Sequence, residues 1–316
     1  MLRRLYRHVR SSWRLFRINQ IRKSIANDAA LAQLNKRYLR MDINGQARFF
    51  ERYAKIFRGE TAPSIDAIWR ITFAGKPFLV PLKSESLWLD WDYALTLAGH
   101  DVDVKLGYQA LLAHRNGPEV FLDVGTNYGT HSLIFLKSGV KSLSFEPNLS
   151  CHHYFAEICR LNAITPRLIS AAVGSVVGEI TIAYPDKETW LTSADPEILA
   201  QLRKDRTLIE QKTPVVILDD YVDELRGKRV LLKIDTEGFE LEVLKGAAQL
   251  LSEIQPYLYF EALPASSHGA AITGLLRDAG YQIVEARHHP LHPEQLLAPS
   301  IGSSHNYLAI PRTQWN

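Results

Sequence analysis

The chain has 316 residues, of which 46% are hydrophobic and 22% charged, a composition typical of a globular protein with one large α/β domain plus an extension, or two small domains. Its two cysteines exclude a disulfide framework and favour a reducing cytoplasm. No apolar run of 18 residues occurs and no uninterrupted apolar core follows the N-terminal arginines, so we expect neither a membrane span nor a signal peptide.

The net charge of +3 is unevenly distributed, because residues 1–27 contain eight basic residues and no acid, whereas the remainder is net acidic. A helix here would carry a basic stripe beside an apolar one. Such a helix can lie in the interface of an anionic membrane or dock on its own protein, and the sequence leaves both open. Nucleic acid is disfavoured, because the acidic remainder offers no continuing phosphate track. The basic stripe is Arg3, Arg7, Arg10, Arg14 and Arg17, and the apolar stripe is Leu2, Leu5, Val9, Trp13 and Phe16.

A helical extension and a β-hairpin are predicted before the main domain. Residues 1–62 are expected to form a basic amphipathic helical extension, because residues 28–58 continue as polar, helix-prone sequence. Residues 63–115 are expected to hold a β-hairpin and a lead-in helix, with strands at 68–73 and 77–81 around a glycine turn. The aromatic residues that follow are expected to pack on the core rather than stack on a sugar; they are Trp88, Trp91 and Tyr93.

A short buried strand, a glycine turn and a helix are predicted over residues 120–136. Asp123 ends the strand, and Gly125 and Gly129 allow the backbone to pass close to a ligand at the helix N-terminus. Asn127 stands where a dinucleotide fingerprint needs its middle glycine, and the Lys of a P-loop is missing. An acid in this turn disfavours a phosphate and suits a cation such as S-adenosylmethionine (SAM), which carries an ammonium and a sulfonium group.

Two further predicted strands end in acids. Residues 142–147 form a strand that ends at Glu146, where a carboxylate can accept hydrogen bonds from both hydroxyls of a ribose. Residues 230–246 form another buried strand that leads into a helix. This second corner holds more acids than a helix N-terminus needs. They are Asp235, Glu237 and Glu240.

In order and spacing, these stretches together resemble the FkbM family of SAM-dependent methyltransferases. The resemblance covers residues 118–263 and leaves the first hundred residues unaccounted for. One departure is Thr126, where the family commonly has Ala. The resemblance implies a Rossmann-like methyltransferase that usually acts on a hydroxyl group of a sugar, glycan or natural product. The matching stretches are Asp123–Gly129, Phe145–Pro147, Leu218–Asp220, Lys233–Gly238 with Glu240, and Leu244–Ala247, with a family-like ending at Asn306–Pro311.

The resemblance also implies a cofactor site made from the ends of successive strands. The residues implied around SAM are Asp123, Gly125, Thr126, Asn127 and Gly129 beside its methionine part, Glu146 with Pro147 at the ribose, and Ala171 or Ala172 near the adenine.

Residues 116–316 are predicted to form one α/β domain, a Rossmann-like methyltransferase fold with about seven strands in a mostly parallel sheet and helices on both faces. The last strand is expected to be antiparallel, as the resemblance implies. The polar stretch 185–212 is expected to be a substrate-side loop or small insertion. The expected strands lie at residues 121–124, 143–145, 167–173, 179–183, 215–218, 230–234, 256–261, 282–285 and 307–310.

Methyl transfer to a hydroxyl requires an aligned acceptor and the removal of its proton. Asp235 is the first candidate for contact with the reacting groups, Glu261 is the second, and either could be the general base; Glu237 completes the catalytic set. As an alternative, these three carboxylates could hold a divalent cation. We expect no metal at Cys151-His152-His153, and we expect Lys233 to pair with a neighbouring glutamate.

The sequence therefore predicts a SAM-dependent O-methyltransferase in the cytoplasm that acts on a sugar, glycan or related small molecule, with SAM as cofactor and no bound metal or nucleic acid. Residues 1–27 are the point of contact if the protein is peripheral to the inner membrane face, and a homodimer stays open. Two alternative hypotheses for the function also stay open. One is a scaffolding protein that keeps the fold without catalysis, and the other is an NAD-dependent oxidoreductase, which the missing middle glycine disfavours.

Overall fold

The computed structural model describes residues 2–58, 63–262, 268–288, 290–291 and 306–312, with side chains from residue 13 onward. The chain divides into two compact units, Met1–Val102 and Asp103–Asn316, and each is considered by itself. Within the described residues, no helix combines the length and apolar character needed to cross a bilayer.

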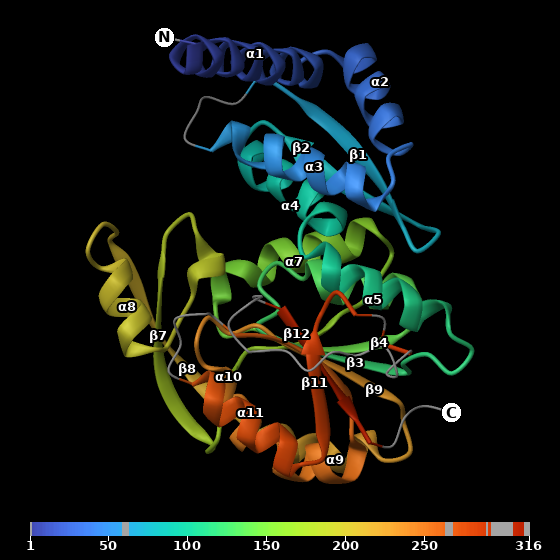
Figure 1. Cartoon of the computed structure of the whole chain (residues 1–316), viewed down its shortest axis with the longest axis vertical. Coiled ribbons are helices and arrows are strands. Elements are labelled where there is room, and N and C mark those ends of the chain that lie inside the picture. The colour runs from blue at the N-terminus through green and yellow to red at the C-terminus, as the bar shows by residue number, and fades with distance from the viewer. Residues whose placement is uncertain (1, 59–62, 263–267, 289, 292–305, 313–316) are drawn as a thin grey trace. The chain divides into compact units, whose positions relative to one another are not determined.

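The N-terminal unit combines helices with a β-hairpin, drawn in blue to cyan in Figure 1. The hairpin strands pair antiparallel across a two-residue turn in which Ala74 and Gly75 have φ values of 47° and 72°, as a type I′ turn requires. This confirms the predicted helical extension and hairpin. The elements are α1 (Leu2–Ile25), α2 (Asp28–Tyr38), α3 (Ile43–Tyr53), the 3₁₀ helix η1 (Ala54–Phe57), β1 (Asp66–Phe73), β2 (Lys76–Lys83) and α4 (Leu87–Gly99).

Aromatic side chains fill the core of the N-terminal unit. Trp69 of β1 and Trp91 of α4 are fully buried, with ring centroids 5.2 Å apart, and Tyr38 lies 5.3 Å from Trp69. The Trp91 indole N–H donates to the carbonyl of Tyr53 at 2.7 Å, which satisfies its buried polar group. Trp91 and Tyr93 therefore pack in the core, as predicted, and are not open to a sugar.

The C-terminal unit alternates strands and helices from Val102 onward. Its helices are α5 (Val102–Ala113), α6 (Thr130–Lys137), α7 (Leu149–Leu161), α8 (Pro196–Leu202), α9 (Val222–Leu225), α10 (Glu240–Lys245) and α11 (Gly269–Asp278), with shorter turns η2 (Thr189–Leu191), η3 (Leu218–Tyr221) and the π-helical η4 (Leu250–Ile254). Its strands are β3 (Val120–Val124), β4 (Lys141–Phe145), β5 (Arg167–Ile169), β6 (Ala172–Val173), β7 (Gly178–Pro185), β8 (Leu208–Val216), β9 (Val230–Ile234), β10 (Tyr257–Glu261), β11 (Tyr281–Glu285) and β12 (Asn306–Pro311).

Seven of the described strands form one sheet in the order β11-β12-β10-β9-β3-β4-β5. Strands β3, β4, β5, β9 and β10 are parallel, whereas β12 runs antiparallel to both β10 and β11. Figure 1 shows α5 and α7 on one side of this sheet and α9, α10 and α11 on the other. The predicted seven-stranded, mostly parallel sheet with an antiparallel last strand is confirmed. Its parallel strands place their carboxyl ends along one edge.

The two faces of the sheet differ in polarity along β3 and β9. Val120, Leu122 and Val124 face the main hydrophobic core, which also takes Leu232 and Ile234. Successive side chains of a strand alternate between faces, so Asp123 and its register partner Lys233 point to the opposite side. A buried acid and a buried lysine thus lie on adjacent strands just before those strands end.

Two of the predicted strands belong to a separate three-stranded sheet, which the sequence analysis did not predict. The order is β6-β8-β7, and β7 and β8 form a long antiparallel ribbon. The predicted strand 167–173 splits into β5 of the main sheet and β6 of the small one. The polar stretch 185–212 contains α8, whose N-cap Asp195 accepts from the amides of Glu197 and Ile198, and whose first residue is a proline.

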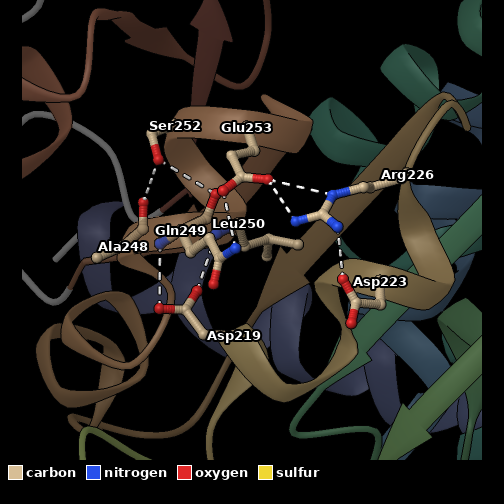
Figure 2. Close-up of polar contacts among 8 residues, drawn as sticks. All are labelled: Asp219, Asp223, Arg226, Ala248, Gln249, Leu250, Ser252 and Glu253. Atoms are coloured by element: carbon tan, nitrogen blue, oxygen red, sulfur yellow. Dashed lines mark hydrogen bonds and ion pairs between the residues drawn. The ribbon is translucent and has the colours of Figure 1, made fainter.

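Two of the stretches that carried the family resemblance meet near η4 and have a structural role. The Asp219 carboxylate accepts hydrogen bonds from the backbone amides of Gln249 and Leu250 at 3.0 and 2.8 Å, as Figure 2 shows. The Asp219 amide donates to the carbonyl of Gly246 at 3.1 Å. The aspartate thereby connects η3 to the start of η4, and an exposed ion pair of Arg226 with Glu253 lies beside it.

Candidate functional site

The Asp123 carboxylate caps the helix that follows the glycine turn. The helix begins after Gly129, which has no side chain to act as an N-cap. Instead, Asp123 Oδ2 accepts from both the backbone amide and the hydroxyl of Ser132, at 3.0 and 2.6 Å. Burial raises the pKa of Asp123 to about 6, against the lowering effects of Lys233 and of the Ser132 hydrogen bonds. Ser132 is a partner that the sequence reasoning missed, although its place three residues into the helix is a usual capping position.

The glycine turn is shaped by protein neighbours. Gly125 has a φ of +82°, and a Cβ there would stand 1.7 Å from the carbonyl oxygen of Asp235. A Cβ at Gly129, with φ of +80°, would stand 2.1 Å from the ring of Phe155. Asn127 takes the left-handed conformation with φ of +51°, which asparagine tolerates better than most residues. The turn therefore packs against the adjacent strand end and α7, and these contacts alone require glycine at both positions.

Glu146 is buried and connects two loops. One of its carboxylate oxygens accepts from the amide of Asn127 at 2.6 Å, and the other accepts from the amide of Asn148 at 2.7 Å. Burial raises the pKa of Glu146 to about 7 in spite of these two hydrogen bonds. Each carboxylate oxygen keeps a second lone pair, so the group can still accept hydrogen bonds from a ribose.

The three predicted catalytic residues converge. Asp235, Glu237 and Glu261 each place a carboxylate oxygen so that the three oxygens lie within 4.8 Å of one another. They follow the carboxyl ends of the adjacent parallel strands β9 and β10. We call these three residues the carboxyl cluster; each is partly buried.

Lys233 pairs with Asp235, whereas the sequence analysis predicted a pair with a neighbouring glutamate. Its Nζ lies 2.6 Å from Asp235 Oδ2, and the lysine side chain is 3% exposed. Residues two apart on a strand share one face of the sheet, whereas the glutamates lie beyond the strand end. The ion pair positions Asp235 and gives the cluster one positive neighbour.

Proximity and burial strongly raise the proton affinity of the two glutamates in the cluster. Burial, the charge of Asp235 and that of Glu240 raise the pKa of Glu237 to about 8. Burial, the charge of Asp235 and a hydrogen bond to Asp235 raise the pKa of Glu261 to about 10. Such carboxyl groups hold protons near neutral pH and accept or release them within the range where general bases operate.

The backbone after β9 is tightly turned to present these acids. Glu237 has a φ of +50° and is followed by Gly238 at +102°. Glu240 stabilises the turn, because one of its carboxylate oxygens accepts from the amides of Thr236 and Gly238 at 2.9 and 3.2 Å. A left-handed glutamate is uncommon, and such strained positions concentrate at functional sites.

Residues from the segment between β7 and β8 reach the same region. The Ser193 hydroxyl donates to the carbonyl of Glu237 at 2.7 Å, and Asn148 Nδ2 donates to Thr192 Oγ1 at 2.9 Å. Thr189 is buried, and its hydroxyl donates to Asn127 Oδ1 at 3.4 Å. All three residues, Thr189, Thr192 and Ser193, lie in the stretch 185–212 that was predicted to be a substrate-side loop or small insertion, but nothing in the sequence pointed to Thr189 itself.

The other expected site residues lie as follows. Thr126 is buried and donates its hydroxyl to the carbonyl of Asp123 at 2.8 Å. The carbonyl of Pro147 accepts from Gln211 Nε2 at 2.7 Å. Ala171 and Ala172 are buried where the chain passes from the main sheet to the small one.

The side chains of Cys151 and His152, in the stretch Cys151-His152-His153, contact different partners. Cys151 is buried, and its thiol donates to Asn127 Oδ1 at 3.3 Å; burial raises its pKa. His152 Nε2 lies 2.8 Å from the carbonyl of Glu146. In the part of the chain that the structure describes, the group of potential metal ligands that comes together is the carboxyl cluster.

The sequence from residue 123 to residue 283, just over half of the chain, matches the family model described as "Methyltransferase FkbM domain". No curated protein matches the sequence.

Several solved structures are similar at low identity. The methyltransferase FkbM of Methylobacillus flagellatus KT is 18% identical with a TM-score of 0.40, over 72% of this chain and 54% of that one, so this chain spans about half of its length. The ribosomal protein L11 methylase of Lactobacillus delbrueckii subsp. bulgaricus is 15% identical with a TM-score of 0.36, over 69% and 82%. The T. thermophilus 16S rRNA N2 G1207 methyltransferase, in complex with AdoMet and guanosine, is 12% identical with a TM-score of 0.38, over 79% and 51%. On the strength of the matched sequence, the chain belongs to the FkbM methyltransferase family.

Proposed function

We propose that this protein is a SAM-dependent O-methyltransferase whose carboxyl cluster receives the hydroxyl group of a sugar, glycan or related small molecule and removes its proton. Membership of the family supports methyl transfer with SAM as the donor. The observation that carries the proposal is the convergence of Asp235, Glu237 and Glu261 within 4.8 Å at adjacent strand ends.

The charges of the region fit a cationic cofactor. Asp123 and Glu146 are buried carboxylates at the ends of β3 and β4, and electrostatic interactions link both of them to Asp235. The positive charge of Lys233 on β9 opposes these acids, but Lys233 is already paired with Asp235. Excess negative charge at the carboxyl edge of the sheet attracts a ligand that carries an ammonium and a sulfonium group.

When bound, SAM supplies an electrophilic methyl group. The residues implied to hold it are the glycine turn at Asp123–Gly129 and Glu146, where spare lone pairs of the Glu146 carboxylate can accept ribose hydroxyls. Asn127 and Thr189 connect this half of the site to the segment between β7 and β8.

The carboxyl cluster can supply the base that a hydroxyl acceptor needs. A sugar hydroxyl is a poor nucleophile while it keeps its proton, so removal of the proton lowers the barrier. Asp235, fixed by Lys233, accepts a hydrogen bond from the hydroxyl, orients it and takes its proton. Glu261 or Glu237 takes the proton instead in those molecules in which that glutamate has lost its own. Their raised pKa values make them stronger bases than ordinary carboxylates.

The test begins with calorimetric binding of SAM and proceeds to formation of S-adenosylhomocysteine with a panel of sugars and glycosides. With an acceptor identified, Asp235→Asn, Glu237→Gln and Glu261→Gln are compared. We expect loss of the base to lower kcat by roughly 10²- to 10⁴-fold while SAM binding is kept. The control is Glu197→Gln, an exposed acid on α8, which should leave kcat unchanged.

A chelator separates base catalysis from metal catalysis. Activity that survives EDTA supports the carboxyl cluster as a base. Activity that EDTA abolishes and Mg²⁺ restores would instead make the same three residues metal ligands. A folded wild-type protein that does not bind SAM would contradict the proposal and favour a scaffold without catalysis.

A further inference from the structure

A cavity of about 810 Å³ lies among α1, α2 and α3 of the N-terminal unit. Four arginines line it: Arg17, Arg37, Arg48 and Arg52. All four side chains are exposed. Its lining also includes the buried apolar residues Ile21, Leu34 and Phe49. We call this cavity the arginine groove. The described residues that line the groove are cationic at its rim and apolar at its floor, and none of them is acidic.

The four guanidinium groups are not neutralised by any acid among the described residues of the unit. Acids are present on the same helices or beside them, at Asp28, Asp42 and Glu51, but none of these lines the groove. Among the described residues, no ion pair or hydrogen bond joins any of the four arginines to an acid. Four like charges around one cavity repel each other, so the groove favours an anionic ligand.

The arginine groove continues along α1 into an exposed apolar surface. Arg17, Gln20 and Ser24 line the groove at helical spacing. One turn toward the N-terminus, the same face of α1 carries Trp13 and Phe16, which are 61% and 56% exposed and whose ring centroids lie 6.2 Å apart. Leu15, which precedes Phe16 in the sequence, is 61% exposed. Aromatic and aliphatic side chains next to arginines are the arrangement found on helices that lie in a membrane interface.

We propose that the N-terminal unit binds an anionic phospholipid surface, with lipid phosphates in the arginine groove and Trp13 and Phe16 inserted at the level of the headgroups. Guanidinium groups bind phosphate oxygens in bidentate geometry, which matches an arginine-lined rim. The apolar floor suits the start of an acyl chain and offers nothing to a nucleic acid. The net acidic remainder of the chain also gives a nucleic acid no continuing track.

The experiment is co-sedimentation of the full chain with vesicles of phosphatidylglycerol mixed into phosphatidylcholine, and with vesicles of phosphatidylcholine alone. We expect binding to the anionic vesicles only, weakening as salt is raised. The double variant Arg48→Glu/Arg52→Glu should bind at least ~10-fold more weakly. Trp13→Ala/Phe16→Ala, which keeps every arginine, should also weaken binding.

The matched control is Arg70→Glu/Lys76→Glu, which makes the same change of charge at exposed positions of the hairpin outside the groove. It should keep binding within ~3-fold of wild type. Equal losses in the control and the groove variant would overturn the proposal, as would unchanged binding in Arg48→Glu/Arg52→Glu. So would preference for duplex DNA or RNA over the anionic vesicles. Circular dichroism verifies that each variant is folded. If the Arg48→Glu/Arg52→Glu variant is unfolded, Trp13→Ala/Phe16→Ala still tests the proposal.

Discussion

Glu237, to which we assign a role in catalysis, lowers the stability of the folded protein. Its pKa is about 8 in the folded protein and about 4.5 when the chain is unfolded. Between these two pKa values, rising pH removes the proton from the unfolded chain while the folded protein keeps it, so folding becomes less favourable. Above about pH 8 both states have lost the proton, and the free energy of unfolding falls no further. Glu237→Gln cannot lose a proton. We expect it to stabilise the fold by roughly 2–4 kcal/mol above about pH 8 and by almost nothing near pH 4.

The measurement is the free energy of unfolding by urea for wild type and Glu237→Gln at a series of pH values. Glu197→Gln is the control, since its exposed side chain on α8 should give no pH-dependent gain. A constant difference at every pH would show that packing of the amide, and not ionisation, is responsible. Groups kept for function at a cost to stability are common in active sites.

At the residue scale, the sequence predicted which acids come together better than it predicted their contacts. Asp235, Glu237 and Glu261 were predicted from strand ends, and parallel strands bring such ends to one edge. The partner of Lys233 could have been found from the two-residue period of a strand. The contacts of Asp123 and Thr189 could not, because they depend on where α6 and η2 come to lie in three dimensions.

Helix α6 depends on a cap supplied from outside it. The Ser132 hydroxyl is fully buried and contacts Asp123 at 2.6 Å and Ser144 at 2.7 Å. Ser132→Ala removes one of the two hydrogen bonds to the Asp123 oxygen and leaves a buried carboxylate less satisfied. We expect a loss of about 1–3 kcal/mol in the free energy of unfolding.

Ser138→Ala, at the C-cap of the same helix, is the matched control, because that hydroxyl donates to the Ile134 carbonyl four residues earlier. Its removal should change the free energy of unfolding by less than about 0.5 kcal/mol. Equal effects at the two serines in urea unfolding would contradict the capping role of Asp123. The loss of stability in Ser132→Ala should also be larger at neutral pH than at about pH 4, where Asp123 of the folded protein, with a pKa of about 6, is protonated and accepts a weaker hydrogen bond.

At the scale of elements, strands were predicted more reliably than their partners. The run Val120–Val124 and the glycine turn were recognisable from residue type alone, whereas the seven-stranded sheet with its antiparallel last strand was expected from the family resemblance. Strands β7 and β8 were predicted as extended segments but their pairing with each other was not, because periodicity identifies an extended segment and not its neighbour. Helix α8 was missed within a polar stretch, although Asp195-Pro196 is a helix start signal.

The division of the whole molecule into two units separates its two proposed roles. The glycine turn, Glu146 and the carboxyl cluster all lie after residue 102, whereas the arginine groove lies before it. The boundary falls at the first residue of α5, so a cut there would remove the start of that helix. A fragment of residues 100–316 keeps α5 whole, because α4 ends at Gly99.

We expect the 100–316 fragment to fold and to bind SAM within ~3-fold of the full chain, about 0.7 kcal/mol, because its sheet has a core of its own. The same fragment should lose the affinity for anionic vesicles. Circular dichroism and urea unfolding establish that it is folded, and calorimetry and co-sedimentation measure the two affinities. If a folded fragment still sediments with anionic vesicles, the membrane-binding surface lies outside the N-terminal unit and the proposal for the arginine groove is contradicted. A folded fragment that loses SAM would mean that residues before 100 support the cofactor site, since every group assigned to SAM lies in the part that remains.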